Sequence, residues 1–107
     1  MPRSEFSLPT LRSLLAASRE SGVPLVLSIA DIIKALSAFV AGEMTREEIA
    51  DWADFYDAND DVTFADDESV PDVIFEVANP EINGWLDEPR AREILVLLHS
   101  RNQEPKQ

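Results

Sequence analysis

A helix-start signal at Thr45 constrains the fold of this chain more than any other local feature. Glu48 follows Thr45 by three residues. In this spacing each side chain accepts a hydrogen bond from the other residue's backbone N–H and so fixes the beginning of a helix. Gly42, just before the signal, is a residue type that commonly ends a helix. The sequence therefore predicts one helix over residues 29–41 and another over residues 45–57.

Apolar stripes with helical spacing recur along the rest of the chain, bounded by caps and by Gly or Pro. They predict three further helices, at 8–20, at 70–78 and from 88 to about 100. Residues 24–28 are apolar enough for a short strand, but no partner strand is evident. We therefore expect them to form an extended connection.

Five helical segments with short links predict an all-α fold, a compact bundle of four to five helices. The length of 107 residues fits a single domain spanning residues 1–107. No internal repeat is visible, and we expect residues 101–107 to be a frayed tail.

The periodicity also predicts which large side chains are buried. The helix at 29–41 has only two charged residues, and the last helix is apolar on nearly every face, so both are expected to be well buried. Trp52 and Tyr56 fall on the core face of their helix. Ile82 is expected to pack inward, whereas Phe55 and Trp85 are candidates for exposure as partner contacts.

Negative charge is concentrated in the middle of the chain. Residues 47–88 contain fifteen Asp and Glu and no Lys or Arg, and they account for the net charge of −12. Such a surface repels nucleic acid and anionic membranes. Clustered charge of one sign accelerates encounter with a partner of the opposite sign. We therefore predict a non-enzymatic protein-binding module whose partner is a basic protein, possibly a toxin or nuclease.

The predicted docking face comprises the helix at 45–57 and the loop at 57–69. Its candidate partner-binding residues are Glu47, Glu48, Asp51, Asp54, Phe55, Asp57, Asp60, Asp61, Asp66 and Asp67. An alternative interpretation is adaptation to high salt. That adaptation usually spreads acidic residues over the whole surface, whereas here they are confined to one region.

Residues 57–68 resemble an EF-hand calcium loop, which gives a second alternative function. The candidate metal ligands are Asp57, Asn59, Asp61, Thr63 and Glu68. The pattern requires Gly with a positive φ at the sixth position, where this chain has Val62. A β-branched residue disfavours that turn, so we predict no metal and no cofactor, with calcium kept as the alternative.

Other chemistry is not indicated. The chain has no Cys, a single His and three Gly, and it shows no Ser–His–acid arrangement or phosphate-binding loop, so we predict no enzymatic activity. No apolar run approaches the ~20 residues that a membrane helix needs, and a cytoplasmic protein is the default expectation.

The segment from Ala38 to Ala53 combines a helix end, Gly42, a capping box and a second helix. Across about residues 32–56 it resembles small acidic helical bacterial proteins of colicin-type immunity-like character. Members of that group are compact acidic bundles that neutralise a cognate toxin. The resemblance implies an immunity or inhibitor role and assigns no individual binding residue.

Overall fold

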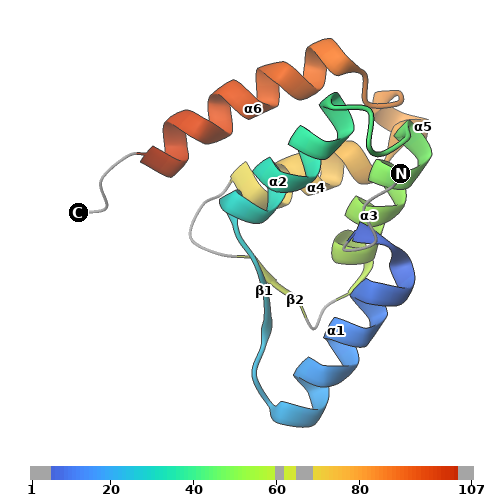
Figure 1. Cartoon of the computed structure of the whole chain (residues 1–107), viewed down its shortest axis with the longest axis vertical. Coiled ribbons are helices and arrows are strands. Elements are labelled where there is room, and N and C mark those ends of the chain that lie inside the picture. The colour runs from blue at the N-terminus through green and yellow to red at the C-terminus, as the bar shows by residue number, and fades with distance from the viewer. Residues whose placement is uncertain (1–5, 60–61, 65–68, 104–107) are drawn as a thin grey trace.

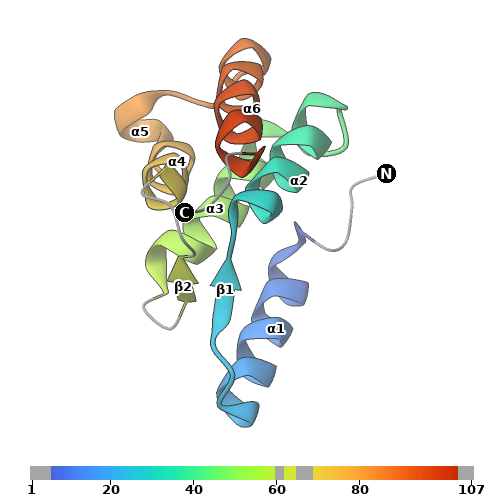
Figure 2. The same ribbon diagram turned by 90° about the vertical axis from the view of Figure 1, so that its left-hand side faces the viewer.

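Two helix pairs form the body of the molecule. α3 (Arg46–Ala58) packs against α4 (Ser69–Ala78), and α2 (Ile29–Val40) packs against α6 (Glu88–Gln103). The structure is a computed structural model that describes residues 6–59, 62–64 and 69–103 (Figure 1). Its elements in chain order are α1 (Leu8–Ser21), β1 (Leu25–Leu27), α2 (Ile29–Val40), α3 (Arg46–Ala58), β2 (Val62–Phe64), α4 (Ser69–Ala78), α5 (Pro80–Asn83) and α6 (Glu88–Gln103). The predicted all-α class is confirmed. In both views α6 and α1 lie at opposite ends of the molecule, with the α3–α4 pair between them (Figures 1 and 2).

Side-chain caps start three of the helices where the sequence predicts them. The Glu48 backbone N–H donates to the Thr45 hydroxyl over 3.0 Å, and the Thr45 N–H donates to the Glu48 carboxylate over 2.8 Å. Ser28 and Asp31 form the same reciprocal arrangement at α2. Asp87 accepts from the backbone of the first turn of α6. Each cap satisfies backbone donors that have no partner inside the helix.

Residues 24–28 contain a strand, so the expectation of an unpaired connection is wrong. Leu25 lies opposite Val62 and Leu27 opposite Phe64 in a two-stranded parallel ladder. The partner strand comes from the acidic segment, in which Val62 is buried. The ladder gives hydrogen-bond partners to backbone groups of both segments. It also ties the segment that follows α3 to the start of α2.

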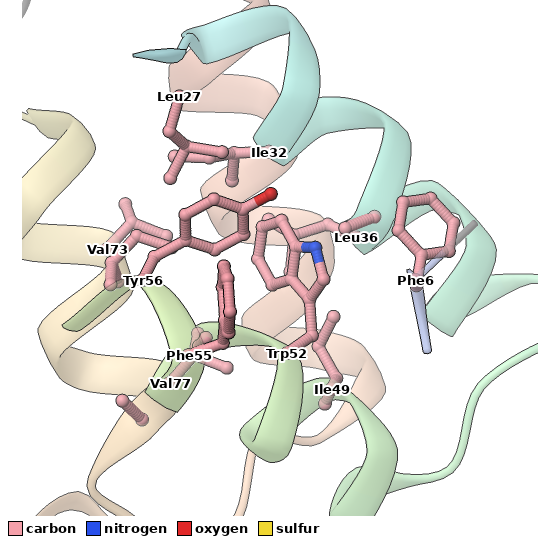
Figure 3. Close-up of a cluster of buried hydrophobic side chains, with 14 of the residues drawn as sticks. Phe6, Leu27, Ile32, Leu36, Ile49, Trp52, Phe55, Tyr56, Val73 and Val77 are labelled. Carbon is pink, nitrogen blue, oxygen red and sulfur yellow. The ribbon is translucent and has the colours of Figure 1, made fainter. Parts of the chain in front are cut away.

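One apolar cluster with contributions from nearly every element holds the fold together. At its centre the Trp52 ring meets the Tyr56 ring edge to face, with centroids 5.2 Å apart, and Phe6 lies against Trp52 at 6.3 Å (Figure 3). Phe55 joins the cluster through an edge contact with Tyr56 at 5.2 Å. Phe55 is therefore buried, and its predicted role as an exposed partner contact is wrong. The α3–α4 packing encloses it, which the spacing within α3 alone could not reveal.

The opposite error occurs at α5 and α6, where apolar side chains predicted to be buried are exposed. Ile82 is 68% exposed and Val96 is 72% exposed. α6 packs chiefly against α2, with Ala91, Ile94 and Leu98 as its buried stripe, so its other faces stay open (Figure 1). Trp85, a candidate for exposure, is 45% exposed. α6 continues to Gln103, three residues into the predicted frayed tail.

An ion pair between Glu76 and Arg90 joins α4 to α6. The Glu76 carboxylate accepts from both Nε and Nη2 of Arg90 over 2.7 Å, in the two-pronged geometry that Arg favours. These hydrogen bonds lower the pKa of Glu76 from its ordinary value of 4.5, although partial burial acts in the opposite direction. A lowered carboxyl pKa stabilises the fold above the ordinary pKa, and this stabilisation is lost as the pH falls through the lowered value.

We therefore expect Arg90→Met to destabilise the protein at pH 7 and to have a smaller effect at pH 3, because the stabilisation declines once the pH falls below the ordinary pKa of 4.5. The side chains of Arg90 and Glu76 are 49% and 31% exposed, so we expect solvent to limit the effect at pH 7 to about 1 kcal/mol. Urea unfolding of both proteins at the two pH values measures the difference. An equal loss at both values would show that packing of the Arg90 stem, and not its charge, stabilises the contact.

Candidate functional site

The outward side of α3 carries a row of carboxylates, which we call the α3 stripe: Glu47, Asp51 and Asp54. All three are exposed. Spacings of four and three residues place them on one side of the helix, whereas Ile49 and Trp52 on the other side are buried in the core. Because core packing fixes the rotation of α3, the stripe is held facing solvent. These three candidate residues are therefore exposed in a single row, and their role in binding stays a prediction.

The aspartates of this helix carry charge that no cation of the described chain neutralises. Asp51, Asp54 and Asp57 are exposed and make no ion pair within the described part of the chain. Asp54 and Asp57 also lie near the negative end of the helix dipole, where a carboxylate is unfavourable. The stripe thus keeps its negative potential at some cost to the stability of the helix.

Two predicted partner-binding residues at the start of α3 have interactions of their own. Glu48 is half-buried, and its carboxylate is engaged in the cap with Thr45, so its first role is structural. Glu47 pairs with Arg46 at 3.2 Å, and both side chains are more than half exposed. The Arg46 guanidinium also lies 5.1 Å from the centre of the exposed Trp85 ring. A partner would therefore meet Arg46 and Trp85 at one end of the stripe.

Two arginines of α6 pair with acids away from the stripe. Arg90 pairs with Glu76 on α4, and Arg92 pairs with Glu88 on α6 itself. These contacts neutralise Glu76 and Glu88, two of the fifteen acidic residues of 47–88. Asp51 and Asp54 take no part in them. Asp60, Asp61, Asp66 and Asp67 lie outside the described residues, so their predicted role stays a prediction.

The strand at Val62–Phe64 contradicts the EF-hand interpretation of residues 57–68. Val62 is extended and buried in β2, where the calcium loop would need a sharp turn. The Asn59 side-chain amide donates to the Phe55 carbonyl over 2.6 Å, closing the end of α3. Thr63 pairs with Val26 in the ladder. Asp61 and Glu68 lie outside the described residues, and the described part of the chain contains no group of three acidic or His side chains placed to hold a metal ion.

Similarity to known proteins does not identify the function of the site. No family model, no curated protein and no solved structure matches this chain. The resemblance of residues 32–56 to immunity-like proteins therefore stays a prediction. Within the described residues, no helix has the length and apolar character needed to cross a membrane.

A cavity of about 240 Å³ that opens to solvent lies on the other side of α3, and no local sequence signal predicts it. Its apolar wall comes from the segment before α1, from α1 and from β1, with Phe6, Leu11, Leu14, Leu25 and Val26. Trp52 and Tyr56 line it from α3, and Asp31 and Lys34 from α2. Trp and Tyr four residues apart are a visible pattern, but the pattern does not distinguish a filled core from a hollow one.

The polar atoms of Trp52 and Tyr56 make no hydrogen bond with any described residue. Both polar atoms keep some exposure to solvent, although the two side chains as a whole are buried. Burial raises the pKa of the Tyr56 hydroxyl to about 12, with Asp31 adding to the shift, so it keeps its proton at neutral pH. The cavity therefore offers two hydrogen-bond donors set among apolar side chains.

Proposed function

We propose that this chain is a non-enzymatic binding module that docks a basic protein through the α3 stripe. The supporting observation is that Asp51 and Asp54 are exposed side by side on a rigidly packed helix and have no cationic partner in the described chain. An unneutralised row of this kind raises the association rate of a positively charged partner and disfavours anionic ones.

The partner class that fits best is a protein whose own site is built to hold phosphates. A nuclease cleft is lined with Lys and Arg, and carboxylates along a helix present a row of negative charge to such a cleft. The resemblance of residues 32–56 to immunity-like proteins supports the same choice. In this proposal the module occupies the cleft and inhibits the toxin or nuclease.

Affinity capture tests the proposal. The immobilised protein is incubated with lysate of the source cells at 50 mM and at 500 mM NaCl. We expect it to retain a basic protein at low salt and to release much of it at high salt, because exposed charge pairs are screened beyond about 10 Å at 0.1 M. The retained protein is then assayed for nuclease or toxin activity with and without the module. Retention of an acidic protein would refute docking through the stripe, and so would retention that does not depend on salt.

A further inference from the structure

The cavity behind α3 has the features of a small-molecule site. Trp52 is 2% exposed and Tyr56 is 7% exposed, yet the indole N–H and the phenol O–H lack partners within the described chain. Figure 3 shows the Trp52 nitrogen on the side of its ring toward Phe6 and the Tyr56 oxygen on the side toward α2. Phe6 and the α2 residues Asp31 and Lys34 line the same cavity. Both donor atoms reach solvent at the cavity, so a ligand acceptor can take the place of water there without breaking a hydrogen bond inside the described chain.

The charge around the cavity favours a neutral ligand. Asp31 and Lys34, one acid and one base, are its only charged lining residues in the described chain, and both are exposed. The rest of the wall is aromatic or aliphatic, which favours an apolar body. The Trp52 indole donates only, and a protonated Tyr56 hydroxyl also donates. A carbonyl oxygen, with two lone pairs and no proton, complements both groups.

The size limits the ligand further. An apolar cavity of about 150 Å³ holds benzene. A cavity of about 240 Å³ is therefore large enough for a bicyclic molecule of about ten non-hydrogen atoms. The cavity opens to solvent, so this size applies to the part of the ligand that is held against its walls.

We propose that this cavity binds a small neutral bicyclic ketone or similarly sized apolar carbonyl compound, whose oxygen accepts hydrogen bonds from Tyr56 and Trp52. The site is separate from the proposed docking face. Trp52 and Tyr56 project from the core side of α3, whereas Asp51 and Asp54 project from its solvent side. Failure of one proposal therefore leaves the other standing.

The test uses 1-indanone as the probe and indane, the same bicycle without the carbonyl, as the matched control. The chain has two Trp residues, so a ¹⁵N-labelled sample gives two indole N–H signals, and Trp85→Phe assigns the Trp52 signal. We expect 1-indanone to shift the Trp52 signal saturably with a Kd below about 1 mM, which ten non-hydrogen atoms can supply. We expect indane to bind several-fold more weakly. No saturable Trp52 shift up to 5 mM, or equal binding of the two probes, would overturn the proposal.

Two variants separate the hydrogen bond from the cavity itself. Tyr56→Phe removes only a hydroxyl that has no partner among the described residues, so the fold is expected to persist. 1-Indanone should then bind about fivefold more weakly, with indane unchanged. Leu14→Trp places a larger ring at an exposed position on the cavity wall and should abolish binding of both probes. Unchanged binding to both variants would overturn the proposal. So would a Trp52 signal that responds to the captured protein and to neither probe, because the cavity would then belong to a protein interface.

Discussion

Replacing Asp51 and Asp54 together with lysine is expected to weaken binding of the captured basic protein at least about 100-fold, or about 3 kcal/mol. Both side chains are exposed and lack a cation within the described chain, so the change turns attraction into repulsion at the proposed contact. The fold should survive, because a lysine near the end of α3 suits the helix dipole better than Asp54 does. Titration of the purified partner against each protein measures the change in Kd.

The matched control carries the same change in net charge elsewhere. Glu20 on α1 and Glu81 on α5 are exposed acids outside the stripe. Replacing both with lysine should change the Kd less than threefold. The added charges act on the partner mostly at long range, where salt screens them. Equal losses in the two double variants would mean that overall charge, and not the α3 stripe, governs binding.

Ile49→Ala is expected to lower the free energy of unfolding by about 3 kcal/mol. Ile49 is 0% exposed and lies on the core side of α3, so truncation leaves a void among packed side chains. For a domain of about this size the loss corresponds to a fall in Tm of about 10–20 °C. Urea unfolding with an unchanged slope would show that the loss is in stability and that the unfolding remains cooperative.

Ile82→Ala is the control for this core prediction, because the residue type is the same and the burial is opposite. Ile82 is 68% exposed, so its truncation should lower the free energy of unfolding by less than about 0.5 kcal/mol. A similar loss at Ile49 and Ile82 would mean that α5 is covered in solution, or that the core does not centre on α3.

Local signals predicted most of the helical architecture. The caps at Ser28, Thr45 and Asp87 are interactions over three residues, so they can be read directly in the chain. The spacing of Ala91, Ile94 and Leu98, the buried stripe of α6, is local in the same way, since each helix fixes its own periodicity.

Features that depend on distant segments escaped prediction. The parallel pairing of Leu25–Leu27 with Val62–Phe64 joins strands far apart in the chain, and no sequence pattern in either strand identifies its partner. Val96 is exposed and Phe55 is buried because of which other elements pack against α6 and α3. The apolar periodicity within a helix does not predict those contacts. The α3 stripe was predictable because charge and helical spacing are both local. The cavity was not, because a void is a property of packing.

Site-specific crosslinking tests the docking face most directly. The chain has no Cys, so a single introduced one is the only attachment point for a thiol-reactive photocrosslinker. Ala58 is exposed and lies four residues beyond Asp54 in line with the stripe, whereas Ser100 is exposed on α6. With the captured partner present, the crosslinker at Ala58→Cys is expected to form the complex in high yield and the one at Ser100→Cys to form little. Efficient crosslinking from Ser100→Cys with none from Ala58→Cys would contradict docking through α3.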